Sequence, residues 1–176
     1  MELGTDAASD TTLRSLGKNF TFADALSVNR ACVAEKLPCA HFVMFGGPGE
    51  TMETVAEGLA NLRQLEHTVV FAFSGIRILP GTPLLTQALK DGLLADGASL
   101  REPVYYLSPQ VDATLMNEMI ANAFRGHRNR VFPPSEGQKR LSIMHRFGYR
   151  GLLWDTLIQF PKEEPAPSNR LKESAC

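Results

Sequence analysis

The stretch His41-Phe42-Val43-Met44-Phe45-Gly46-Gly47-Pro48-Gly49-Glu50-Thr51 decides the fold class of this chain. Its first five residues form an apolar run, which is typical of a strand that is covered on both faces in a parallel sheet. The glycine-rich turn comes next. Apolar residues between positions 52 and 65 then recur at spacings of three and four, which indicates one face of a helix. The stretch therefore predicts a strand, a tight turn and a helix in succession.

A similar unit follows downstream. Residues 69–73 are again an apolar run and predict a strand, which leads into the loop Ile76-Arg77-Ile78-Leu79-Pro80-Gly81. Thr82-Pro83 supplies a helix cap with proline at the first helical position, and Gly92 marks the expected end of that helix.

A third unit precedes the quoted stretch. Residues 1–5 predict a strand, and Ser9 and Asp10 are suitable caps for the helix that follows. Thr21 with Asp24 predicts a capping box at the start of a second helix. Three strand-then-helix units in a row predict an α/β fold, specifically a fragment of a TIM-like barrel with three parallel β/α units over residues 1–95.

The pattern changes after residue 95. Apolar spacing predicts one helix over residues 111–124 and a last helical stretch from about residue 136 to residue 157. We therefore expect a mainly helical C-terminal extension over residues 96–160. Prolines and charges over residues 161–176 predict a disordered tail.

Composition excludes several function classes. The 176 residues carry 18 Lys and Arg against 19 Asp and Glu, a net charge of -1, which lacks the basic field of a nucleic-acid-binding protein. No apolar run approaches the roughly 20 residues that span a bilayer, and no signal peptide opens the chain, so we expect a cytoplasmic protein. The three cysteines, Cys32, Cys39 and Cys176, have no zinc or iron–sulfur spacing, and we predict no metal site.

The glycine turn predicts the rim of a ligand site, because ligands of parallel α/β folds sit at the carboxyl ends of the strands. A P-loop needs Gly-Lys-Ser/Thr, and Glu50-Thr51 stands there instead. Glu50 and Asp6 would bring two carboxylates to one rim, which favours a ligand with hydroxyls and positive charge over a phosphate. Each carboxylate could instead only cap its own helix.

Three segments together resemble a known family, the radical S-adenosylmethionine enzymes. Residues 2–10, with Leu13 and Lys18 after them, look like the fourth-strand segment of that barrel. Residues 42–51, which end in Gly-Gly-Pro-Gly-Glu-Thr, resemble the fifth-strand segment. Residues 77–84, with their Pro-Gly-Thr turn, resemble the sixth-strand segment. The pattern is most similar to the cobalamin-binding-domain branch.

The resemblance implies an iron–sulfur oxidoreductase or transferase that cleaves S-adenosylmethionine reductively at a 4Fe-4S cluster, with cobalamin as a possible further cofactor. It places Asp6 and Ala7 by the ribose and Met44 and Gly46 by the adenine, and it makes Gly47 a further cofactor-binding residue. It places Ile78, Leu79 and Pro80 along the adenine edge. Glu50 would order the loop or accept a hydrogen bond from the cofactor. Arg77, on the rim loop, is a candidate for a carboxylate of cofactor or substrate.

The Cys-x-x-x-Cys-x-x-Cys loop of that family is absent from the chain. We therefore expect the second half of such an enzyme, inactive in isolation, whose partners are the missing N-terminal half and a small-molecule substrate. The alternative is a non-enzymatic half-barrel interaction module, which would form a homodimer through exposed strand edges. An unrelated barrel enzyme that uses Asp6 and Glu50 as acid and base is the third hypothesis.

One polar cluster remains. His127 and His145 lie in sequence among Arg125, Arg128, Arg130, Arg140 and Arg146, a pattern that predicts a solvated face in preference to an anion site.

Overall fold

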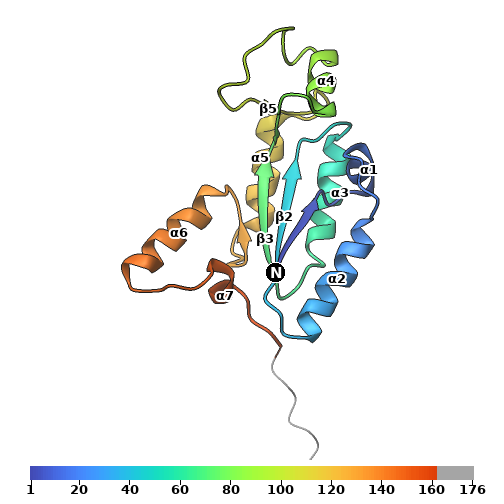
Figure 1. Cartoon of the computed structure of the whole chain (residues 1–176). Helices are drawn as coiled ribbons and strands as arrows, with labels where there is room; N and C mark the ends of the chain where they lie inside the picture. The colour runs from blue at the N-terminus through green and yellow to red at the C-terminus, as the bar shows by residue number, and fades with distance from the viewer. Residues whose placement is uncertain (162–176) are drawn as a thin grey trace, which may run out of the picture.

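The computed structural model describes residues 1–161, and its centre is a four-stranded parallel sheet (Figure 1). The strands are β1 (Glu2–Asp6), β2 (Ala40–Phe45), β3 (Val69–Ser74) and β6 (Arg130–Val131), in the order β1-β2-β3-β6. All neighbouring pairs are parallel, and β2 and β3 pair along their whole length, from Ala40 with Val69 to Phe45 with Ser74. Strands β1 and β6 are the two edges of this sheet.

Four helices cover one face of the sheet. They are α1 (Asp10–Ser15), α2 (Phe22–Ala34), α3 (Met52–Leu62) and α5 (Ala113–Phe124). Side chains of successive strand residues point to opposite faces of the sheet. Those of Val43 and Phe45 in β2 point towards these helices and pack with Val70 and Ala72 of β3 in the main core. The predicted alternation of strand and helix therefore places the apolar helix faces on a shared core.

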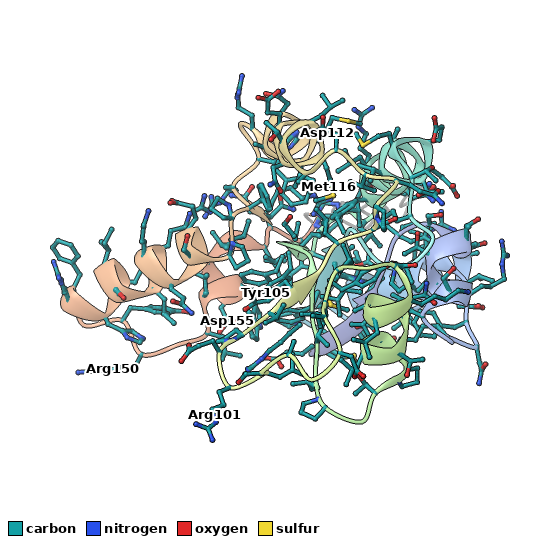
Figure 2. The ribbon with its side chains drawn as sticks, turned by 90° about the horizontal axis from the view of Figure 1, so that it is seen from above. Arg101, Tyr105, Asp112, Met116, Arg150 and Asp155 are labelled. Atoms are coloured by element: carbon teal, nitrogen blue, oxygen red, sulfur yellow. The ribbon has the colours of Figure 1, made fainter. Side chains whose placement is uncertain are left out.

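Two later helices, α6 (Ser135–Arg146) and α7 (Leu153–Leu157), lie on the opposite face. Their core contains Ala40, Phe71 and Leu153, and Phe42 stacks on Phe71 with ring centroids 5.1 Å apart. Trp154 meets Phe71 edge to face at 6.4 Å. Figure 2 shows the two layers from above, with Met116 of α5 on one side of the sheet and Asp155 of α7 on the other.

A small subdomain stands above the carboxyl ends of the strands (Figure 1). It contains β4 (Ile76–Arg77), which pairs antiparallel with β5 (Tyr105–Tyr106), and α4 (Pro83–Lys90). The Tyr106 hydroxyl donates to Asp91 Oδ2 at 2.7 Å and ties the end of α4 to β5. None of the helices in residues 1–161 has both the length and the apolar character needed to cross a bilayer.

Several local predictions are confirmed. The side chains of Thr21 and Asp24 form the predicted capping box of α2, and Thr82 caps α4 with Pro83 at its first turn. The predicted strands at residues 41–45 and 69–73 are β2 and β3. Helix α3 ends at Leu62, three residues before the predicted end, because the last turn tightens and Leu65 N donates to Leu62 O at 3.2 Å.

The structure differs from the predictions at two places in the second half of the chain. The count of three parallel strands misses β6, which is two residues long and pairs with Val70 and Phe71. The extension over residues 96–160 contains α5, α6 and α7 and also the two-residue strands β5 and β6. The predicted helix over residues 136–157 is two helices, separated where Gly148 adopts a φ of +85° that favours glycine. Of the predicted tail, residues 162–176 lie outside the described residues.

Candidate functional site

A cavity of about 430 Å³ lies at the carboxyl ends of β1 and β2, and we call it the strand-end cavity. Its walls come from the end of β1, from α1 and the loop after it, from β2, from β4 and from the start of α4. The lining residues are Asp6, Ser15, Leu16, Lys18, Met44, Pro48, Ile76, Arg77, Leu79, Thr82, Pro83, Leu84 and Gln87. Its position is the one that parallel sheets use for ligands.

Asp6 reaches this cavity through an irregularity in β1. The register slips by one residue between Leu3, which faces His41, and Asp6, which faces Val43. Asp6 itself has a φ of +59°, a left-handed conformation that aspartate tolerates better than most residues. A bulge of this kind re-aims a side chain. The Asp6 carboxylate forms an ion pair with Lys18, which also lines the cavity.

Glu50 is buried, only 2% exposed, and does not line the strand-end cavity. Its Oε2 accepts hydrogen bonds from Gly46 N and from Gly47 N, the latter at 3.0 Å. Burial raises the pKa of the Glu50 carboxyl to about 6, while the two backbone hydrogen bonds lower it. The carboxylate therefore orders the glycine turn from within.

The two carboxylates do not form the shared anionic rim that the sequence suggested. Glu50 points into its own turn, and Asp6 is paired with Lys18. The charged side chains that line the strand-end cavity are Asp6, Lys18 and Arg77, one anion and two cations. This lining suits a ligand that carries both signs of charge, and the argument against negatively charged groups no longer holds.

Gly46 is favoured by its backbone conformation and by a close neighbour. Its φ is +86°, and a Cβ atom there would stand 2.2 Å from Leu107 Cδ1. Gly46 O also accepts from Ser108 N at 2.9 Å, and the Ser108 hydroxyl donates to Glu50 O at 2.7 Å. The segment after β5 therefore lies directly against the glycine turn, where the sequence suggested the approach of a ligand.

The ten predicted site residues divide between the cavity and its surroundings. Four of them line the strand-end cavity, namely Asp6, Met44, Arg77 and Leu79. Ala7 and Ile78 are buried in apolar clusters, with exposed fractions of 1% and 2%. Gly46, Gly47 and Glu50 form the turn beside the cavity, and Pro80 is exposed outside its lining.

Sequence reasoning gave no role to several of the lining residues. Lys18 was noted only as part of a motif, and its pairing with Asp6 depends on the chain folding back after α1. Gln87 lies on α4, and its amide donates to Asp91 Oδ1 at 2.8 Å. Thr82 had been assigned only a capping role. A polar residue one turn into a helix carries no sequence signal of its own, which explains why Gln87 was missed.

A metal cluster does not fit on the part of the chain that the structure describes. Among residues 1–161, no group of three or more His, Cys, Asp or Glu side chains is arranged to hold a metal ion. Cys32 and Cys39 are both buried, and Cys39 lies just before β2, at the end of the sheet opposite the strand-end cavity. Any iron–sulfur cluster would therefore need ligands from elsewhere.

Comparison with known proteins yields a structural match alone. No protein-family model matches the sequence, and no curated protein matches it. The fold is similar to that of TsrM from Kitasatospora setae, a radical S-adenosylmethionine methyltransferase whose structure contains cobalamin and a 4Fe-4S cluster. The TM-score is 0.67 at 20% sequence identity, and the match covers 89% of this chain and 37% of that one. This chain thus has the fold of just over a third of that enzyme.

Proposed function

We propose that this chain forms part of the S-adenosylmethionine pocket of a radical S-adenosylmethionine enzyme, an iron–sulfur oxidoreductase or transferase of the cobalamin branch. The observation that carries the proposal is the strand-end cavity, in which residues from all three family-like segments meet. Asp6 comes from the first segment, Met44 and Pro48 from the second, and Arg77 and Leu79 from the third. The fold similarity to a cobalamin-containing radical enzyme supports the same assignment.

The lining residues have chemistry that suits this ligand. The Asp6 carboxylate is able to accept hydrogen bonds from ribose hydroxyls, and Lys18 holds that carboxylate in place. Met44 and Leu79 offer apolar surface to an adenine, and the Arg77 guanidinium matches the geometry of a carboxylate. S-adenosylmethionine, when bound, supplies an activated methyl or adenosyl group.

Glu50 and the glycine turn act one step further away. The turn supplies Pro48 to the cavity wall, and the buried Glu50 carboxylate holds Gly46 and Gly47 in position. We assign to Glu50 the loop-ordering role, because its side-chain oxygen is already engaged by two backbone donors. A role for Asp6 and Glu50 as an acid–base pair has no support in this arrangement, since only Asp6 faces the cavity.

The ligands of the 4Fe-4S cluster would come from a partner segment that carries the Cys-x-x-x-Cys-x-x-Cys loop. We place that segment against the free edge of β1. Edge strands present unpaired backbone groups that accept another strand. The same edge supports the second candidate function, a half-barrel module that dimerises. Sedimentation of the chain alone separates the two, since a stable dimer that persists after a cluster-bearing half is added would contradict the enzyme proposal.

The test of the pocket is nuclear magnetic resonance of the ¹⁵N-labelled chain during titration with S-adenosylmethionine to millimolar concentration. We expect shifts at Asp6, Met44 and Arg77. Asp6→Asn keeps a residue that tolerates left-handed backbone and removes the charge, so it should weaken binding about tenfold, the effect of one lost charge-assisted hydrogen bond. Asp96→Asn, at an exposed loop position, is the matched control. Equal binding by all three proteins, or shifts confined to other regions, would overturn the assignment.

A further inference from the structure

A second cavity, of about 440 Å³, lies at the opposite end of the sheet, where the loop after α5 enters β6. We call it the basic pocket. Its polar lining consists of Arg125, His127, Arg128, Arg130, Arg140 and Glu136. Residues from the loop, from β6 and from α6 thus meet around one concavity. His145 and Arg146, which the sequence grouped with them, do not line it.

Three of the arginines are held by backbone carbonyls. Arg130 donates to Leu62 O at 3.0 Å and to Leu65 O at 2.6 Å, both near the end of α3. Arg140 donates to Arg128 O at 2.9 Å, and Arg128 donates to Thr156 O. A guanidinium has five N–H donors, so each of these bonds fixes the group while leaving donors for a ligand. The basic pocket is therefore partly preorganised.

The positive charge in the basic pocket exceeds what the surrounding fold neutralises. Its single carboxylate, Glu136, is paired with Lys139 at 2.7 Å, and no arginine of the pocket forms an ion pair with a carboxylate within residues 1–161. The carboxyl ends of α3 and α5 contribute roughly half a negative charge each. Helix α6 begins beside the pocket and presents its positive end. The four arginines therefore carry more positive charge than the two helix ends and Glu136, which is shared with Lys139, offset.

We propose that the basic pocket binds a small molecule that carries a di- or triphosphate group. A guanidinium group donates two parallel hydrogen bonds to a pair of phosphate oxygens. Several guanidinium groups from different elements are therefore best neutralised by an anion with several charges. The cavity volume lies in the range of small-molecule sites, about 300 to 1,000 Å³. The net charge of the chain is -1, so the chain as a whole lacks the basic excess of a nucleic-acid-binding protein.

The test is calorimetric titration of the full chain with pyrophosphate, with inorganic phosphate and an oligoglutamate peptide as comparison ligands. We expect saturable binding of pyrophosphate at one site and weaker binding of phosphate. Trp154 is the only tryptophan and lies two residues from Thr156, which Arg128 contacts, so its fluorescence gives a second readout.

Variants locate the site. Arg125→Gln changes an exposed side chain, and Arg140→Gln changes a half-buried one. Each should weaken pyrophosphate binding about tenfold or more, the loss of one hydrogen bond to a charged group. Arg101→Gln removes the same charge from an exposed position that Figure 2 shows at the periphery, and it should leave binding unchanged. Melting temperatures establish that the variants are folded.

Three results would overturn the proposal. The first is an absence of saturable pyrophosphate binding by the unaltered chain. The second is equal affinity in Arg101→Gln, Arg125→Gln and Arg140→Gln, which would show only a general charge effect. The third is tighter binding of oligoglutamate than of pyrophosphate, which would indicate an acidic protein segment as the occupant.

Discussion

The two ends of the parallel sheet use polar side chains in different ways. At the amino end, His41 is fully buried between Thr5 Oγ1, 2.7 Å from its Nδ1, and Asn29 Oδ1, 3.1 Å from its Nε2. At the carboxyl end, Asp6, Lys18 and Arg77 line the strand-end cavity, and only the buried Glu50 is satisfied by backbone donors alone. Around β1 and β2 the amino end is closed on its polar groups, and the basic pocket lies farther along that end, beside β6. The carboxyl ends of β1 and β2 instead leave polar groups facing a cavity.

The same contrast appears in the titration of the two buried groups. Burial lowers the pKa of His41 to about 4, helped by the Arg130 cation, whereas burial raises the pKa of Glu50 to about 6. Both shifts favour the neutral form, because a buried charge loses its hydration. Their effects on stability have opposite signs. His41 destabilises the folded chain as pH falls, and Glu50 destabilises it as pH rises.

The largest expected effect is at the amino end. His41→Ala should lower the free energy of unfolding at pH 7 by about 4 kcal/mol, because Thr5 and Asn29 lose a buried partner and a cavity remains. The unaltered histidine stabilises the fold above pH 6.5, and that contribution, about 3 kcal/mol, is lost as pH falls towards 4. Urea denaturation at pH 7 and pH 4.5 measures both quantities.

A comparable acid loss in His41→Ala would show that another group titrates. The exposed His145, replaced by alanine, is the matched control and should change stability by less than about 0.5 kcal/mol.

The next effect concerns the glycine turn. Gly46→Ala should destabilise the fold by about 3 kcal/mol, since it adds the cost of left-handed backbone to a contact of 2.2 Å with Leu107. Gly92→Ala has a φ of +70° with open space around it, and it should cost only the backbone part, about 1 kcal/mol. Thermal unfolding of the two variants separates packing from backbone strain. Equal losses would mean that Leu107 moves aside freely.

The smallest of the three effects is carried by Glu50. Its raised pKa stabilises the fold below pH 4.5, and about 2 kcal/mol of that is lost as pH rises through about 6. In Glu50→Gln this dependence should disappear, while the exposed Glu102→Gln should retain it. The measurement is urea denaturation from pH 4.5 to 7 with His41 replaced in both proteins, so that the opposing titration is removed. An unchanged slope in Glu50→Gln would contradict the buried position of this carboxylate.

Sequence reasoning recovered the local chemistry of the first half of the chain. The apolar runs of β2 and β3, the capping box at Thr21 and the proline start of α4 are all encoded within a few neighbouring residues. The same reasoning missed β6, because a strand of two residues has no alternation to detect. It joined α6 to α7 because the apolar spacing continues across Gly148.

The sequence predicted where the candidate site lies, but it predicted only some of the residues that line it. Four of the ten predicted residues line the strand-end cavity, since the ends of parallel strands meet at one edge of a sheet. The direction of the Glu50 side chain was not predictable from its position in the turn, because it depends on two backbone N–H groups and on burial. The Ser108 hydroxyl, from a distant segment, binds the Glu50 backbone carbonyl. The arginine cluster was visible in the sequence, where it predicted a solvated face in preference to an anion site. The cavity that it lines was not predictable, since Arg125 and Arg140 come together only when α6 packs beside the loop after α5.

The sequence by itself determined the strand–turn–helix units, their parallel order and the edge at which the strand-end cavity lies, because periodicity and turn residues act locally. Only the tertiary structure decided which charges meet. Asp6 pairs with Lys18, Glu50 turns inward, and the arginines after α5 gather around one cavity. Electrostatic interactions depend on distance and burial, and neither is written in the spacing of residues along the chain.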